Sequence, residues 1–475
     1  MKLNQYTKVI LGLIVLFITQ ASCSKILNLN PTDQIDEKDI FKSVESLERA
    51  VLGVYANWNL EYSLRIASVM SDECRLGLNN AGVSAAGQNL FRWNYSSEDN
   101  EIVEPWKNGY QVIDRVNRLL AGISHVPSNK EADKEKLDLL QGELLAIRAY
   151  QHFDLYRIYA ASGTYNGQAL AVPYVKKSNT NSQPSRPNTE SFFSDFWHDM
   201  KEAETLLAGK DALANSRMGL LATYALHARA ALYTLNYPEA EHYATAVIQK
   251  IPLASGQTFE KIWKDESNTE LIFKLKRTNV SEIRPGDLFY NIGAERILFA
   301  PSLQLMSLYD EADDVRFNSY FEEDPNLADE GELTERIIKY QGSDSAPNRT
   351  DVKVFRTSEM YLIRAEAALQ KNDQNSAEND INTLRRARIE NYNNETFDNE
   401  EEVKAAIETE RYKELAFEGH RYFDLKRWGK AINRSNLDVE PRYMFLSTND
   451  KAYLIPIPQG EVLANPNIRP NNPGW

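Results

Sequence analysis

The residues that most often carry catalysis form no recognisable motif in this 475-residue chain. The chain has neither a Gly-x-Ser-x-Gly nucleophile motif nor a dinucleotide fingerprint. Its nearest approach to a phosphate loop, Gly82 to Gly87, is followed by Gln88-Asn89 where Lys-Ser/Thr is required. The six His never pair at three or four residues, and two distant Cys cannot form a zinc knuckle. The sequence therefore predicts a protein that is not an enzyme and uses no metal or cofactor.

Acidic residues leave one catalytic alternative open. The two carboxylates of a glycosidase lie about 5 to 10 Å apart in the folded protein, and local spacing in the sequence does not reveal such a pair. With 68 Asp and Glu, the presence of carboxylates discriminates nothing. The acidic stretch from Glu322 to Glu332 lacks the ligand order of an EF-hand, so we interpret it as a solvated loop.

Charge is also concentrated in a predicted helix from Val403 to Trp428. Its charged residues are spaced to form a ladder of ion pairs, and the aromatic residues around them indicate partial burial. Since no nucleophile or metal set accompanies them, we interpret these residues as structural. They are Glu410, Arg411, Glu414, Glu418 and Arg421.

The overall composition is that of a folded, acidic protein. The chain has 54 Lys plus Arg and 68 Asp plus Glu, so its net charge is 54 − 68 = −14, which makes nucleic acid an unsuitable partner. With 42% hydrophobic and 26% charged residues, it lies in the globular range. The length corresponds to roughly two to four domains, or to one large helical assembly.

The N-terminus has the parts of a secretory signal. Lys2 and Lys8 precede an apolar run from Val9 to Ile18, which is too short to span a bilayer. Small residues before Cys23 resemble a bacterial lipobox, in which cleavage leaves an acylated Cys; cleavage near Ala21 without lipidation is the alternative. We predict a signal peptide over residues 1–22, a lipidated tether over 23–40 and one assembly over 41–475.

Helical periodicity dominates after the tether. The segment Glu143 to Tyr159 has too many apolar residues for one narrow stripe, so we expect a helix that is buried on most sides. Two further helix pairs repeat at a shift of 137 residues, with an aromatic residue and small residues at matching positions. This pattern is typical of tetratricopeptide repeats. The first pair carries Tyr224, Ala228, Ala231, Ala240, Ala244 and Val247, and the second carries Tyr361, Ala365, Ala368, Ala377, Ile381 and Leu384.

Other segments depart from this helical pattern. Glu270 to Lys276 alternates like a half-buried strand, and residues 310 to 349 are acidic, polar and typical of surface loops. The C-terminal segment, NPNIRPNNPGW, reads as an extended tail, which Trp475 packs down if it packs at all.

Several segments resemble the SusD/RagB family in their residues, their order and their spacing, and together they extend over essentially all of the mature chain. They are AIRAYQHFDLYRIYA, AVPYV, RPNTESFFSDFWHDMKEAETLL, FRTSEMYLIRAEAAL, ERYKELAFEGHRYFDLKRW and YLIPIPQGEVLANPNIRPNNPGW. The resemblance implies a mainly α fold with four tetratricopeptide-like repeats, loop-rich insertions and minor β-structure. It also implies a lipoprotein of the bacterial outer membrane that captures oligosaccharide, or in some members peptide, and delivers it to a SusC-like TonB-dependent transporter. The resemblance further implies a lipid-anchored protein that faces the cell exterior, although Ser24 to Leu27 lack the acidic residues that often follow the acylated Cys in surface-exposed members.

Family likeness places ligand-facing loops near residues 71–95 and 277–349. A sugar site needs exposed aromatic rings with amides, carboxylates or Arg around them. The spacing of Phe91, Trp93 and Tyr95 predicts that they lie on one face of a strand. We expect these three rings to be buried in the core and not to form the surface on which a sugar stacks. Trp93 nevertheless stays among the ligand candidates. The candidates are Asp72, Arg75, Asn79, Asn80, Gln88, Asn89, Trp93, Phe289, Tyr290, Asn291 and Arg296.

Three function classes follow. Glycan capture leads, peptide capture by the same protein is the alternative, and a glycoside hydrolase is the outsider. Exposed aromatic residues in excess of charged groups in the cleft would favour sugar, and the reverse would favour peptide. A closely facing carboxylate pair in a deep cleft would favour the hydrolase.

Overall fold

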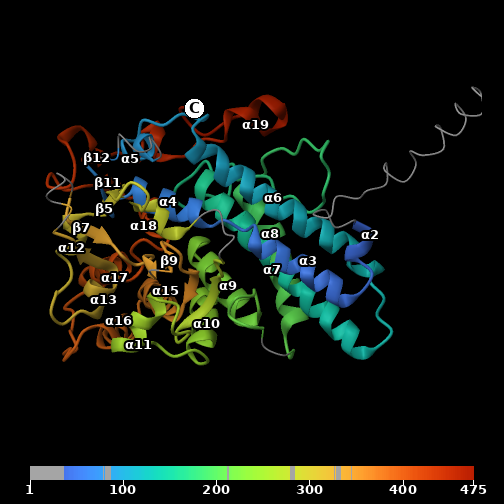
Figure 1. Ribbon diagram of the computed structural model, residues 1–475, viewed down its shortest axis with the longest axis horizontal. Coiled ribbons are helices and arrows are strands. Elements are labelled where there is room, and N and C mark those ends of the chain that lie inside the picture. Colours follow the sequence, from blue (N-terminus) through green and yellow to red (C-terminus); the bar gives the residue numbers. More distant parts are fainter. Residues whose placement is uncertain are drawn as a thin grey trace, which may run out of the picture.

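Small residues at helical spacing allow long helices to pack closely, and such helices build most of this molecule (Figure 1). The computed structural model describes residues 37–78, 80, 87–210, 213–278, 284–325, 327, 333–343 and 345–475. The predicted signal peptide, Cys23 and most of the predicted tether lie outside these residues. Within the described part, no helix has the length and apolarity needed to cross a membrane.

The fold is mainly α, as predicted. The helices of the N-terminal half are α2 (Glu37–Ile40), α3 (Val44–Ala56), α4 (Glu61–Met70), α5 (Gln88–Phe91), α6 (Asn100–Gly122), α7 (Glu131–Tyr159), α8 (Thr189–Leu207), α9 (Leu220–Tyr233), α10 (Tyr237–Ile248) and α11 (Gly256–Trp263). Those of the C-terminal half are α12 (Leu303–Met306), α13 (Val315–Tyr320), α15 (Thr357–Gln370), α16 (Gln374–Arg388), α17 (Glu400–Glu414), α18 (Arg421–Arg427) and α19 (Gln459–Ala464).

Consecutive long helices pack against each other from α6 through α7, α8, α9, α10, α15 and α16 to α17. The closeness of α6 and α7 depends on Gly109, where an added Cβ would lie 2.8 Å from Gln151 Nε2 and 2.9 Å from Leu155 Cδ2. One hydrophobic cluster contains buried residues from Val44 to Ile468, so the elements share a common core.

Both predicted repeat pairs are helical hairpins. The first is α9 with α10, the second is α15 with α16, and α10 packs against α15 to join them. The small and aliphatic residues at the matching positions are at most 2% exposed, which confirms the packing inferred from their spacing. Asn236 and Asp373 cap the second helix of each pair by accepting hydrogen bonds from Glu239 N and Ser376 N.

The predicted helix over 143–159 is the C-terminal part of α7, and every residue from Gly142 to Tyr159 is buried. The predicted single helix from Val403 to Trp428 is wrong, because it is two helices, α17 and α18. Phe417 and Gly419 separate them with φ angles of 63° and 84°. A helix cannot continue through this left-handed backbone conformation.

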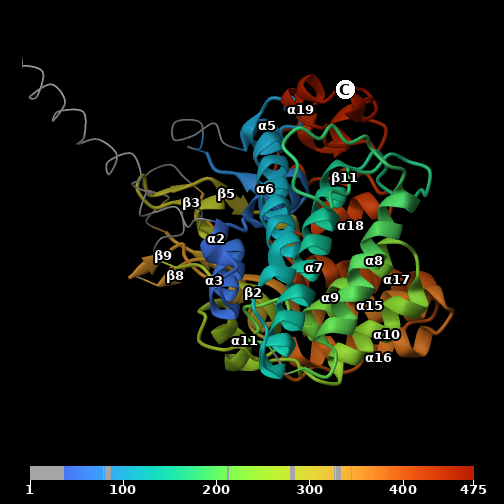
Figure 2. The same ribbon diagram turned by 90° about the vertical axis from the view of Figure 1, so that its right-hand side faces the viewer.

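The strands are short (Figure 2), and they pair in two-stranded sheets. The antiparallel pairs are β1 (Cys74–Leu76) with β5 (Phe299–Pro301), β2 (Leu271–Leu275) with β10 (Val352–Arg356), β3 (Tyr290–Asn291) with β4 (Arg296–Ile297), β6 (Phe321–Glu323) with β7 (Glu335–Ile337), β8 (Gly342–Ser343) with β9 (Ala346–Pro347), and β11 (Ile432–Asn433) with β12 (Phe445–Leu446). The predicted strand over 270–276 is β2, but it is buried on both faces instead of one.

The C-terminal segment lies against the helical body. Trp475 stacks on Tyr95 with ring centroids 5.5 Å apart, and its Nε1 donates to the carbonyl oxygens of Lys451 at 2.8 Å and Leu454 at 3.0 Å. Trp475 therefore packs this segment down, as its sequence suggested.

Candidate functional site at the loop face

The two loop regions predicted to face a ligand meet in the structure. In the pairing of β1 with β5, Cys74 lies opposite Pro301 and Leu76 opposite Phe299. Beyond this pair, the N–H of Gly77 donates to Leu298 O at 3.0 Å. Only glycine fits at position 77, since the Cβ of any other residue would lie 1.9 Å from the carbonyl oxygen of Ile297. Residues more than 200 positions apart thus form one surface, which we call the loop face and define as β1, β3 to β7 and their connections.

The hairpin of β3 and β4 presents three of the predicted ligand residues. Asn291 lies opposite Arg296, and Tyr290 lies opposite Ile297. The Oδ1 of Asn291 accepts from the N–H of Ala294 at 3.0 Å and holds the turn. The side chains of Tyr290, Asn291 and Arg296 are all half-buried, so part of each faces solvent.

Arg336 on β7 fixes the Tyr290 ring, and the sequence did not identify this role. Its guanidinium carbon lies 4.1 Å from the ring centroid, and its Nη1 lies 3.5 Å from Asp324 Oδ2. One face of the ring is therefore covered by a cation. The available signal was that Arg336 is the first basic residue after the acidic stretch that begins at Glu322.

Asp72 and Arg75 are buried in structural contacts and do not line the surface. Asp72 forms a two-point ion pair with Arg421, at 2.8 Å for each bond. Arg75 donates to Pro301 O at 2.9 Å and lies 2.9 Å from Glu335. Their polar groups, which made them ligand candidates, are used to join the N-terminal loop to distant parts of the chain.

Other candidates also lie inside the fold. Asn80 is fully buried and donates to Leu298 O at 2.8 Å. Gln88 is 8% exposed and accepts from Arg92 at 2.9 Å, whereas Asn89 is exposed and donates to Asp99 at 3.2 Å. Phe289 is a core residue, 2% exposed. Asn79 lies outside the described residues.

The predicted strand with Phe91, Trp93 and Tyr95 on one face does not exist. Phe91 ends α5, and Trp93 lies in the following turn with a φ of 54°. Phe91 and Tyr95 are buried, which confirms that they are core residues. Trp93 is half-buried; its Nε1 donates to Met70 O at 3.0 Å, and the Arg434 guanidinium lies 4.0 Å from its ring centroid.

A cavity of about 910 Å³ opens beside β6 and β7, between them and α12 and α13. Its apolar wall includes Phe317 and Phe321, and the exposed Leu437 lies at its edge. Four carboxylates line it, and no Lys or Arg does so among the described residues. They are Glu311, Glu322, Glu323 and Glu335. Such a cavity disfavours anions and admits hydroxyl or cationic groups. Within the described part of the chain, no group of three or more His, Cys, Asp or Glu is arranged to hold a metal ion.

Comparison with known proteins agrees with this architecture. A family model described as "SusD family" matches residues 315–475, and one described as "Starch-binding associating with outer membrane" matches residues 27–232. The chain is thus similar to SusD-type proteins in both its N-terminal and its C-terminal part, as the resemblance to the SusD/RagB family predicted. SusD-like protein P2 of Formosa agariphila is 23% identical over 97% of this chain and 98% of its own length. SusD-like protein P38 of the same organism is 24% identical over 86% of this chain and 89% of its own length.

Solved structures share the fold. A SusD superfamily protein from Bacteroides thetaiotaomicron superposes with a TM-score of 0.79 and 24% identity, covering 91% of this chain and 100% of that one. A protein from Bacteroides vulgatus described as a putative sugar binding protein gives a TM-score of 0.76 and 24% identity, covering 91% of this chain and 99% of that one.

Proposed function

We propose that this protein is an outer-membrane lipoprotein that captures neutral oligosaccharide at the loop face and delivers it to a SusC-like TonB-dependent transporter. The observation that carries the binding role is the half-buried Tyr290, which Arg336 holds in place beside Asn291 and Arg296. A sugar ring can stack on an aromatic ring while the amide and guanidinium bind its hydroxyl groups.

The charge of the adjoining cavity selects among glycans. Uronates and sulfated sugars would meet Glu311, Glu322 and Glu323, which are exposed, whereas neutral hydroxyl groups can donate to these carboxylates. The absence of a nucleophile motif in the sequence supports a role in capture without cleavage.

Calorimetric titration of the purified full chain with malto-, cello-, xylo- and mannohexaose tests this proposal. We expect binding of at least one of them, and a loss of about tenfold in affinity in Tyr290→Ala at unchanged melting temperature. Tyr224→Ala, at a tyrosine in the repeat helices, is the control for removal of a half-buried ring. If none of the four sugars binds, or if Tyr290→Ala binds as the wild type does, glycan capture at the loop face is wrong.

Peptide capture is the second candidate, because the four glutamates of the cavity also suit Lys and Arg side chains. Charged groups outnumber exposed aromatic rings in this cavity. The cavity lining therefore supports a peptide ligand more strongly than the sequence alone did. Titration with a Lys-rich and a Glu-rich peptide separates the two cases. Tight binding of the Lys-rich peptide alone, with no hexasaccharide bound, would replace the glycan proposal.

Delivery and anchoring have separate tests. Acylation at Cys23 predicts that Cys23→Ala releases the protein from membranes; an unmodified N-terminus elsewhere in a soluble wild type would contradict this. Partnership with a transporter predicts that affinity purification from detergent-solubilised membranes recovers a TonB-dependent channel with the wild-type protein. Recovery without such a channel would leave capture as the whole function.

A further inference from the structure

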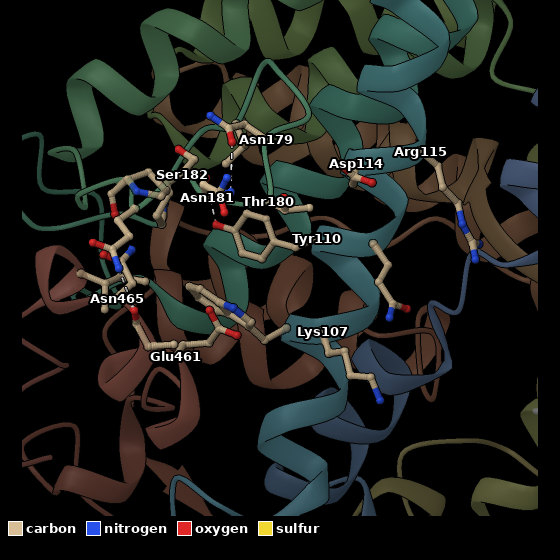
Figure 3. A pocket seen from close by; sticks show the side chains of 18 residues that line it. Lys107, Tyr110, Asp114, Arg115, Asn179, Thr180, Asn181, Ser182, Glu461 and Asn465 are labelled. Atoms are coloured by element: carbon tan, nitrogen blue, oxygen red, sulfur yellow. Dashed lines mark hydrogen bonds between the residues drawn. The ribbon is translucent and has the colours of Figure 1, made fainter. Parts of the chain in front are cut away.

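A second cavity, of about 790 Å³, lies between α6, the segment 173–184 and α19 (Figure 3). None of its lining residues belongs to the loop face. Its size is within the range of pockets that hold small organic ligands.

Aromatic side chains from successive turns of α6 form its inner wall. Trp106 and Tyr110 have ring centroids 4.8 Å apart, with an angle of 52° between the rings. Trp106 is 3% exposed, while Tyr110 is half-buried and lies between the 179–182 segment and Glu461 (Figure 3). The spacing of four residues places both rings on the same side of the helix.

The start of the 173–184 segment is fixed to the helices. Tyr110 donates to Pro173 O at 2.8 Å, and the N–H of Val175 donates to His152 Nε2 at 2.8 Å. Burial lowers the pKa of His152 to about 3, so its ring is neutral above that pH, with the Nδ1 proton directed to Arg148 O at 2.9 Å. This attachment is therefore independent of pH across the physiological range.

The end of the segment is fixed to the C-terminal region. Asn465 donates to Pro184 O at 2.8 Å, Asn467 donates to Gln183 O at 2.9 Å, and Gln183 donates to Ala464 O at 3.0 Å. With both ends held, the exposed residues 179–182 form a ready-made rim, and a ligand would not have to order them.

The rim offers neutral polar groups. The side chains of Gln111, Thr180, Asn181 and Ser182 are exposed and have no hydrogen-bonding partner among the described residues. The lining charges cancel, because Lys107 and Arg115 balance Asp114 and Glu461. Lys107 and Asp114 are also engaged elsewhere, by Glu104 at 3.2 Å and by Arg118 at 2.8 Å. Amides and hydroxyls around an aromatic wall, without net charge, suit a neutral polyol more than an ion or a charged peptide.

We propose that this cavity is a second saccharide site, which binds a short stretch of neutral oligosaccharide against Tyr110, with Gln111, Asn181 and Glu461 as hydrogen-bonding groups. It extends the proposed function but uses none of the residues of the loop face. Two separated sites would let one long glycan, or two short ones, bind the protein at once.

Hydrogen–deuterium exchange of the purified full chain with maltohexaose, cellohexaose, xylohexaose and mannohexaose tests the proposal. We expect at least one sugar to slow exchange in residues 177–184 and 459–465. The double variant Gln111→Ala with Glu461→Gln should lose this protection, with binding to the cavity weakened roughly tenfold, because the exposed Gln111 amide is removed and the half-buried Glu461 carboxylate becomes a neutral amide of the same size. Gln249→Ala, at the exposed glutamine that follows the last residue of α10, is the matched control and should keep it.

The loop face gives an independent readout in the same experiment. Tyr290→Ala should abolish protection of residues 290–297 and leave that of 177–184 intact. Protection confined to residues 290–297 would overturn the second site and leave the proposed function standing. Protection confined to residues 177–184 would overturn capture at the loop face and leave the second site standing. Unchanged protection of 177–184 in the double variant would also overturn the assignment.

Discussion

The Glu73 carboxyl group is fully buried beneath the loop face, between Asp72 and Cys74. Burial raises its pKa to about 8, although the nearby Ser68 hydroxyl and Phe417 N–H lower it in part. Neither of its oxygens has a hydrogen bond of ordinary geometry within the described residues. Glu73 is therefore uncharged below that pH.

The pKa of Glu73 predicts a pH-dependent stability. Between the ordinary value of 4.5 and about 8, the folded state binds a proton that the unfolded state releases, so the free energy of unfolding falls as pH rises through this window. Relative to Glu73→Gln, the wild type should lose up to about 5 kcal/mol from pH 4.5 to 8, at 1.36 kcal/mol per pKa unit. Urea unfolding at several pH values measures this difference. The exposed Glu98→Gln should show no such slope, and a flat difference for Glu73→Gln would contradict the prediction.

Trp93 is a structural residue with a partly exposed ring. Trp93→Ala removes its hydrogen bond to Met70 O and its contact with Arg434, and should lower the free energy of unfolding by about 2 to 3 kcal/mol, below the value for a fully buried Trp. Affinity for a bound hexasaccharide should change little. Chemical unfolding and calorimetry on one sample measure both quantities. A stable variant that no longer binds sugar would place the ligand platform at Trp93.

At the scale of elements, the turn between α17 and α18 ends the first helix and places Arg421, at the start of the second, where it reaches Asp72. Gly419 has a φ of 84°, and its added Cβ would lie 3.2 Å from Leu64 Cδ2. Gly419→Ala should therefore destabilise the protein by about 1 to 2 kcal/mol. Gly53→Ala is the matched control in α3, with nothing within 4 Å of the new Cβ, and should stabilise by about 0.5 to 1 kcal/mol. Thermal or urea unfolding measures both; equal effects would contradict the role of this turn.

The sequence predicted elements well where the signal is local. The repeat hairpins follow from Ala228, Ala244, Ala365 and similar residues, because helical spacing alone determines which side of each helix is small. The break at Phe417 was missed since the apolar pattern continues across it, and a single Gly419 is weak evidence for a helix end. The two loop regions meet in the structure, but Asp72 and Arg75 have partners hundreds of residues away, which no local pattern reveals.

At the scale of the whole molecule, the charged residues of α17 join elements from across the C-terminal half. Glu414 accepts from Arg356 at 2.8 Å, from Arg388 at 2.9 Å and from Arg316 at 3.1 Å, all of them buried. Glu418 pairs with Arg356 at 2.7 Å. The ladder predicted within one helix is therefore a network between β10, α13, α16 and α17, and its interpretation as structural agrees with this geometry.

Breaking this network should strongly lower the free energy of unfolding. Glu414→Gln leaves three buried guanidinium groups short of one carboxylate, so we expect a loss of about 3 to 5 kcal/mol. Glu401→Gln, exposed in the first turn of the same helix, should change the free energy of unfolding by under about 1 kcal/mol. Urea unfolding separates the two, and similar values would show that the network contributes little.

Low pH should disrupt the same network of ion pairs. Although burial opposes ionisation, Arg316 and Arg385 lower the pKa of Glu410 to about 2 from 4.5. Its contribution to stability is therefore fully present above pH 4.5 and is lost as pH falls towards 2. Acid titration followed by circular dichroism should show a transition in this range that is shifted to higher pH in Arg385→Gln. An unshifted transition would contradict the assignment.

The ion pair of Asp72 with Arg421 has a consequence for how the molecule folds. Its partners are 349 residues apart, and the hydrogen bond from Tyr95 to Ala452 O spans 357 residues. Contacts of such sequence separation form late, because closing a long loop requires most of the chain to be available. The repeat hairpins, built from neighbouring helices, can form early, but the loop face is completed only after α18 is in place. A nascent chain therefore holds no finished loop face until residues 421–427 have been made, so this surface is completed late.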